Sequence, residues 1–253
     1  MNGEGRMLEE GSVLREGRID YGRAWRYQLD DEHWIVTLLC VTAAVIVPIV
    51  GGIVALGYQG AVIEALAREG AGARPPRFDF DKLVEYLLRG LRMFVVSLLM
   101  TLVMLPLLWL GSVIMLAVVL GTAHAIGPQS TAGIAVSCGL TGLFVLLYLV
   151  VALAAAVVMT PPTVRAALDR DFGKIFDFVW ARDFLRRTGR EGWKVHLFVI
   201  AINLGLFIVG LLALVIGVFP AMAFGLLVQA HLYGQLYLLY LRRGGAPVAL
   251  PAA

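Results

Sequence analysis

Three polar side chains near the end of the chain are the best candidates for chemistry within an otherwise apolar segment. Gln229, His231 and Gln235 lie among residues that are almost all apolar. His231 and Gln235 are four residues apart, which puts both on one face of a helix. Two interpretations are open: hydrogen bonds between helices, or the lining of a pore or a substrate path. We favour the hydrogen bonds as the simpler interpretation.

The remaining polar residues form no catalytic pattern. Asp79, Asp81 and Glu85 are explained by helix capping and surface solvation more simply than by acid–base chemistry. The four histidines show no metal-ligand spacing. The chain has neither a nucleophile elbow (G-x-S-x-G) nor a phosphate-binding loop (G-x-x-x-x-G-K-[ST]). We therefore expect no enzymatic activity, no metal and no cofactor.

The composition is too apolar and too poor in charge for a soluble domain. Of the 253 residues, 60% are hydrophobic and 15% are charged, and the mean hydropathy is +0.83. No Asp, Glu, Lys or Arg occurs between Arg92 and Arg165, or between Lys194 and Arg242. A charge at mid-depth in a bilayer costs about 2.5–3.5 kcal/mol, so such tracts suit helices in lipid. The basic residues flank these tracts, which makes lipid headgroups a better anionic partner than nucleic acid.

The lengths of the apolar runs predict the fold, because about 20 helical residues cross the ~30 Å hydrocarbon core. We expect an all-α, polytopic transmembrane helical bundle. A polar segment, 1–33, precedes a single transmembrane domain, 34–241, and a tail, 242–253, follows it. The five predicted spans are Trp34–Gly57, Met93–Leu120, Gly133–Thr160, Val195–Gly217 and Phe219–Leu241.

The positive charge predicts how the chain is oriented in a prokaryotic cytoplasmic membrane. Lys and Arg gather before the first span, in the two long connections and after the last span, which places both connections and the carboxyl terminus in the cytoplasm. Five crossings would then put the amino terminus outside, although it carries five arginines. A break at Pro48–Gly52 offers an alternative, a re-entrant Trp34–Gly57 with both ends cytoplasmic. We favour a crossing first helix because of the repeat described next.

A short motif occurs twice and indicates an internal repeat. Phe78-Asp79-Phe80 recurs as Phe176-Asp177-Phe178, and each copy leads through an arginine-bearing amphipathic segment into a span. The predicted units are residues 34–120 and 133–217, with 219–241 as an additional helix. Units of two spans each keep the same orientation, so the repeats would be parallel.

The two amphipathic segments show apolar residues at helical spacing, which predicts two helices at the membrane surface. Such helices either cap the bundle with a solvated face or bind lipid or a partner. Tryptophans at the interface and arginines toward anionic headgroups suit a position at the membrane surface. The solvated face is the simpler of the two interpretations. The residues predicted for a lipid- or partner-binding surface are Arg89, Arg92, Trp180, Arg182, Arg186, Arg187 and Trp193.

Several short motifs are spread along the chain. They are Ile19-Asp20-Tyr21-Gly22-Arg23-Ala24, Asp31-Glu32-His33-Trp34, Pro48-Ile49-Val50-Gly51, Gly57-Tyr58, Pro75-Pro76-Arg77-Phe78-Asp79 and Gly234-Gln235-Leu236-Tyr237. Together they resemble one known family, an uncharacterised prokaryotic membrane family called domain of unknown function number four thousand and thirteen. The resemblance covers roughly residues 19–241 and implies a polytopic membrane protein, without an activity or a site.

The expected function is that of a membrane scaffold or accessory subunit whose cytoplasmic amphipathic helices engage anionic lipid or a protein partner. The alternative is a homo-oligomeric channel or small-molecule transporter lined by the polar face of the last helix.

Overall fold

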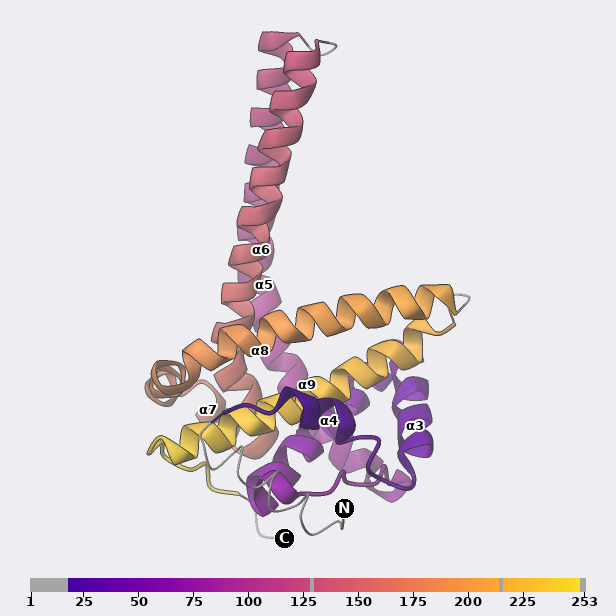
Figure 1. Cartoon of the computed structure of the whole chain (residues 1–253). Coiled ribbons are helices and arrows are strands. Elements are labelled where there is room, and N and C mark those ends of the chain that lie inside the picture. Colours follow the sequence, from indigo (N-terminus) through magenta and orange to yellow (C-terminus); the bar gives the residue numbers. More distant parts are fainter. Residues whose placement is uncertain (1–17, 128–129, 214–215, 251–253) are drawn as a thin grey trace. The chain divides into compact units, whose positions relative to one another are not determined.

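The computed structural model describes residues 18–127, 130–213 and 216–250, so residues 1–17 of the predicted polar segment and 251–253 of the tail lie outside it. All its regular elements in this part of the chain are helices (Figure 1). Five stretches are long and apolar enough to cross a membrane, which confirms the all-α, polytopic prediction. The elements are α2 (Tyr21–Arg26), α3 (Trp34–Ile46), α4 (Val50–Glu69), η1 (Gly70–Gly72), η2 (Phe80–Lys82), α5 (Leu83–Ile126), α6 (Thr131–Leu168), α7 (Phe172–Ile175), α8 (Phe178–Leu212) and α9 (Val218–Arg242).

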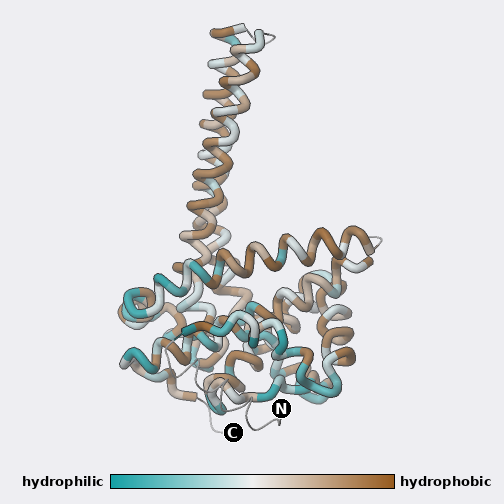
Figure 2. Tube along the Cα trace, in the orientation of Figure 1, coloured by the Kyte–Doolittle hydropathy of each residue, from teal (hydrophilic) through white to brown (hydrophobic). Residues whose placement is uncertain are grey.

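The chain divides into two compact units. One comprises Ser97–Ala156, the distal parts of α5 and α6, which run side by side as a helical hairpin (Figure 1). Its outward side chains are apolar and exposed, for example Leu105, Trp109 and Leu146. Figure 2 shows hydrophobic residues along most of both helices. Because two helices cannot bury so many apolar side chains, this surface suits the acyl chains of a bilayer.

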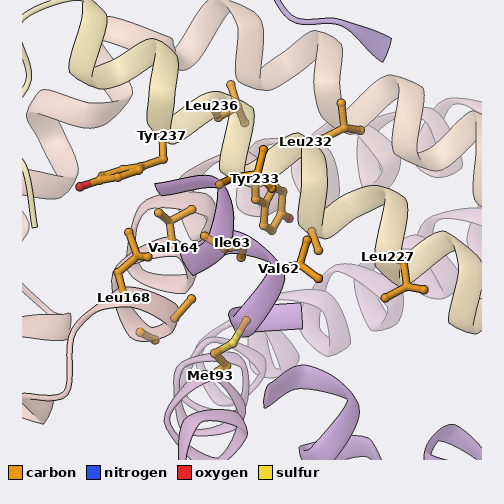
Figure 3. Packing of buried hydrophobic residues seen from close by; sticks show 14 of the residues in the cluster. Val62, Ile63, Met93, Val164, Leu168, Leu227, Leu232, Tyr233, Leu236 and Tyr237 are labelled. Atoms are coloured by element: carbon orange, nitrogen blue, oxygen red, sulfur yellow. The ribbon is translucent and has the colours of Figure 1, made fainter. Parts of the chain in front are cut away.

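Helix α9 is the centre of the other unit, which contains the rest of the chain. It packs against α2, α3, α4 and α8, and most of its side chains are buried. The sequence predicts this helix as an addition to two repeats, because it follows the second predicted unit. Its central position was not predicted, because hydropathy does not distinguish lipid-facing from protein-facing apolar residues. Figure 3 shows side chains of α4, α6 and α9 gathered in the core, among them Val62, Ile63, Val164, Leu168, Leu232 and Leu236.

The first predicted span is two helices, which corrects the single helix expected for Trp34–Gly57. Helix α3 ends at Ile46 and α4 begins at Val50. Between them the chain reverses in a γ-turn, in which the Val50 N–H donates to the Pro48 carbonyl at 2.7 Å. Ile49 at the centre of the turn has φ +62°, a strained value for a β-branched residue. The turn lies within the predicted break.

Helices α3 and α4 form an antiparallel hairpin with an apolar tip and a charged base. Near the turn Gly51 lies against the Ala44 carbonyl, and farther along Tyr58 lies beside Thr37. The 13 residues of α3 span about 20 Å, too little to cross a ~30 Å hydrocarbon core. The nearest charged residues, such as Glu32 before α3 and Glu64 in α4, lie away from the tip.

Helices α4 and α5 touch backbone to backbone at two glycines. A Cβ added to Gly57 would lie 1.8 Å from the Tyr86 carbonyl oxygen. A Cβ added to Gly90 would lie 1.8 Å from the carbonyl oxygen of Ile53. Both distances are far below van der Waals contact, so the crossing of these two helices requires glycine at both positions.

The two amphipathic segments are the first turns of long helices. Residues 83–92 continue into the apolar part of α5, and residues 178–194 continue into the apolar part of α8. Neither segment is a separate helix. The duplication itself stays a prediction.

Candidate functional site

Asp177, the aspartate of the recurring motif, caps the N-terminus of α8. The Asp177 carboxylate accepts hydrogen bonds from the N–H groups of Val179 and Trp180, both at 3.0 Å. The hydrogen bond from Trp180 is the main cause of the lowered pKa of Asp177, and the nearby Arg165 guanidinium, at 3.0 Å, lowers this pKa further. This cap fixes the beginning of α8.

The inward face of α8 includes the buried Trp180 and Phe184, and beside them Asp183 and Arg187, whose side chains are 35% and 34% exposed and contact the end of α9 and the tail. The Trp180 indole N–H donates to the Ala246 carbonyl at 3.1 Å. The Tyr240 hydroxyl donates to Asp183 at 3.1 Å. Arg187 binds Asp183 at 2.8 Å and also donates to the Arg243 carbonyl. Trp180 and Arg187, both predicted on a lipid- or partner-binding surface, are therefore engaged within the protein.

The two arginines predicted on the first amphipathic segment are also partly enclosed. Arg89 is buried and bridges Glu85 of its own helix, at 2.9 Å, and Glu64 of α4. It clamps α4 onto α5 within the chain, and a contact of Arg89 with lipid stays a prediction. Arg92 is half-buried, and its Nε atom has no hydrogen-bond partner among the described residues.

The outward face of α8 carries the cations that remain available. Arg182, Arg186, Arg190 and Trp193 are exposed, and no ion pair or hydrogen bond engages the three arginines in the described part of the chain. We call these four residues the basic face. Arg190 was not predicted, although the four-residue spacing from Arg182 through Arg186 leads directly to it.

The same outward face becomes apolar after Trp193 and the exposed Lys194. Leu197, Ile200 and Leu204 continue it at helical spacing and are all at least half exposed. Figure 2 shows this change from hydrophilic to hydrophobic along α8. A face that is cationic on one side of a tryptophan and apolar on the other matches the boundary between headgroups and acyl chains.

A family model matches residues 40–231, about three quarters of the chain, and its description is "Protein of unknown function (DUF4013)". The chain belongs to this family. The match confirms the resemblance found in the sequence and includes the whole basic face. No curated protein and no solved structure matches the chain.

Within this family member, Gln235 binds the amino-terminal segment. Its side-chain amide accepts from the Asp20 N–H at 2.7 Å and donates to the Asp20 carbonyl at 2.9 Å. The same amide lies 3.0 Å from His231 Nδ1, and both side chains are fully buried. Tyr27 packs on the His231 ring with centroids 4.2 Å apart. These contacts correspond to hydrogen bonding between elements, the simpler of the two interpretations.

Gln229 belongs to a second network. It donates to the Tyr233 hydroxyl at 2.7 Å, and this hydroxyl lies 3.2 Å from His196 Nε2. Thr160 approaches the same nitrogen at 3.4 Å. The predicted stripe of Gln229, His231 and Gln235 thus divides between two networks within one chain. Nowhere in the described residues do three or more His, Cys, Asp or Glu side chains come together to hold a metal ion.

Proposed function

We propose that this protein is a non-enzymatic membrane scaffold whose basic face binds anionic lipid headgroups at the cytoplasmic surface of a prokaryotic membrane. The supporting observation is the change from cationic to apolar at Trp193 on the outward face of α8. A tryptophan at this boundary suits the membrane interface, and arginines beyond it reach phosphate groups. Each such cation contributes about 1 kcal/mol near an anionic surface.

The three helical hairpins are consistent with all charged segments lying on the same side of the membrane. The charge-free tracts 33–63, 93–164 and 195–241 cover parts of the α3/α4, α5/α6 and α8/α9 hairpins, respectively, and the charged ends of α4, α5, α6 and α8 lie outside them. A hairpin returns the chain to the side from which it entered. With α3/α4 re-entrant, the amino-terminal arginines join the other basic blocks in the cytoplasm, and the conflict with the positive-inside rule disappears.

A channel lined by α9 has less support. Gln235 and His231 are buried and hydrogen-bonded inside a single chain, and Gln229 is bonded to Tyr233. A water-filled path along these residues would require the amino-terminal segment to leave α9 first.

The lipid-binding proposal predicts a loss of lipid selectivity when the basic face is neutralised. The triple variant Arg182→Gln/Arg186→Gln/Arg190→Gln is expected to lose up to about 3 kcal/mol of attraction to anionic lipid at low salt. Native mass spectrometry after reconstitution with phosphatidylglycerol and phosphatidylethanolamine measures which lipids remain bound. The wild type is expected to retain phosphatidylglycerol preferentially.

A matched control removes the same charge elsewhere. Arg26→Gln/Arg74→Gln/Lys174→Gln also replaces three exposed cations. It is expected to keep the selectivity of the wild type. Equal selectivity in the two triple variants would contradict the role of the basic face.

A further inference from the structure

A cleft of about 520 Å³ lies between the α2–α3 connection and the segment that follows η1. Its volume is within the range of small-molecule sites, about 300–1,000 Å³. The first segment contributes three carboxylates, Asp30, Asp31 and Glu32, and the second contributes the guanidinium groups of Arg74 and Arg77. All five residues lie outside the charge-free tracts, so we expect the cleft to open to water rather than to lipid.

These five charged side chains do not neutralise one another. In the part of the chain that the structure describes, no ion pair or hydrogen bond engages any of them, although both signs of charge line the cleft. Four of them are exposed, and Asp31 is half-buried. Arg23 also lines the cleft, whose lining therefore balances three arginines against three carboxylates. A ligand that keeps this balance carries one positive and one negative group.

A buried hydroxyl without a partner belongs to the same lining. Tyr27 is only 2% exposed, and its hydroxyl has no hydrogen-bond partner among the described residues. Buried polar groups in native proteins almost always have such a partner. The unpaired hydroxyl therefore indicates that a bound molecule completes this part of the site.

The uncharged part of the lining favours a water-soluble ligand over a lipid headgroup. Besides Tyr27 it consists of small residues, which are Ala71, Gly72, Ala73 and Pro75. The acyl chains of a lipid need apolar surface beside the headgroup site. Among the described residues, no large aliphatic side chain lines this cleft. The small residues leave space for the body of a compact polar molecule.

We propose that this cleft binds a free α-amino acid. The carboxylate of the ligand accepts hydrogen bonds from Arg74 and Arg77, because the planar guanidinium group suits bidentate contact with a carboxylate. Its ammonium group donates to the three carboxylates of the α2–α3 connection. The Tyr27 hydroxyl supplies one more hydrogen bond. This binding does not depend on lipid binding, because the basic face lies on α8 and contributes no residue to the cleft.

The standard L-α-amino acids are the probes, each added at millimolar concentration to the purified full-length protein in detergent. We expect at least one of them to raise the Tm, because a ligand that binds only the folded state stabilises that state. Isothermal titration calorimetry then gives its Kd. The N-acetyl and amide derivatives of the same amino acid are expected to bind about tenfold or more weakly, since each loses charge-assisted hydrogen bonds. This comparison uses the wild-type protein, so it does not depend on how well any variant folds.

Two neutral variants assign the two ends of the ligand. Arg74→Gln/Arg77→Gln is expected to raise the Kd of the free amino acid about tenfold or more and to bind it no more tightly than its amide. Asp30→Asn/Asp31→Asn/Glu32→Gln is expected to bind the free amino acid no more tightly than its N-acetyl derivative. The control Arg170→Gln/Lys174→Gln removes two exposed cations outside the cleft and should bind like the wild type.

The proposal is overturned if no amino acid raises the Tm, or if the two derivatives bind as tightly as the free amino acid. A wild-type Kd in both cleft variants would overturn it as well. Binding of O-phosphoethanolamine without binding of any amino acid would also contradict it, because the cleft would then hold a lipid headgroup.

Discussion

Replacing Gly57 with alanine is expected to destabilise the protein by about 3 kcal/mol, at the upper end of the usual cost of overpacking. The added Cβ would lie 1.8 Å from the Tyr86 carbonyl oxygen, so it meets backbone rather than a flexible side chain. Helices α4 and α5 must then move apart. At this chain length the loss corresponds to a Tm lower by roughly 6–12 °C in thermal unfolding of the purified protein in detergent. Gly90→Ala changes the other backbone contact between α4 and α5 and is expected to lower the Tm by a similar amount.

Gly52 provides the matched control in α4. A Cβ added there would meet no atom within 4 Å. Alanine favours a helix interior over glycine by about 1 kcal/mol, so Gly52→Ala is expected to be neutral or slightly stabilising. Equal Tm values for the Gly52 and Gly57 variants would show that α4 and α5 do not touch at this point.

Replacing Arg89 with methionine is the second change with a large expected effect. The side chains of Arg89 and Glu64 are only 8% and 13% exposed, so the variant leaves a largely buried carboxylate with Arg68 as its remaining ionic partner. Removing one partner of a buried ion pair costs about 3–5 kcal/mol, and we expect a value near the lower end because Arg68 stays. Chemical or thermal unfolding in detergent measures the loss.

Two controls test whether the loss comes from the buried ion pair. One is a double-mutant cycle, and the other is a change in an exposed ion pair. Glu64→Gln combined with Arg89→Met should cost less than the sum of the single changes, because no buried charge is left without its partner. Lys174→Met removes a pair whose side chains are 61% and 54% exposed, and should cost less than about 1 kcal/mol. Similar losses at positions 89 and 174 would contradict a buried clamp.

The membrane-spanning elements follow from the sequence because charge is excluded from hydrocarbon. The charge-free tracts predicted where the long helices lie, and Pro48 predicted the position of the turn in the first of them. Its neighbour Ile49 carries no such signal, since nothing in its chemistry favours a positive φ. The turn is maintained by packing of α3 on α4 and α9, which only the fold defines.

The division of α8 into two faces is only partly predictable. All four of these α8 residues, Trp180, Arg182, Arg186 and Arg187, were predicted on one surface, although helical spacing separates Trp180 and Arg187 from the other two. Which face is covered depends on the end of α9 and the tail, more than fifty residues away in the chain. The contact of Gln235 is even less predictable from the sequence, because its partner Asp20 is 215 residues distant and contributes only backbone atoms. No side-chain pattern in a single sequence marks such a contact.

The most direct test of the account is the side of the membrane on which each charged block lies. Cys40 and Cys138 are the only cysteines, so replacing both with alanine gives a background for single cysteines at Arg26, Arg74 and Lys174. A membrane-impermeant thiol reagent applied to intact cells and to inverted vesicles reports the side. We predict that all three positions react only in inverted vesicles. Reaction at position 26 in intact cells, with positions 74 and 174 protected, would show that the first hairpin crosses the membrane and would contradict the single cytoplasmic charged face.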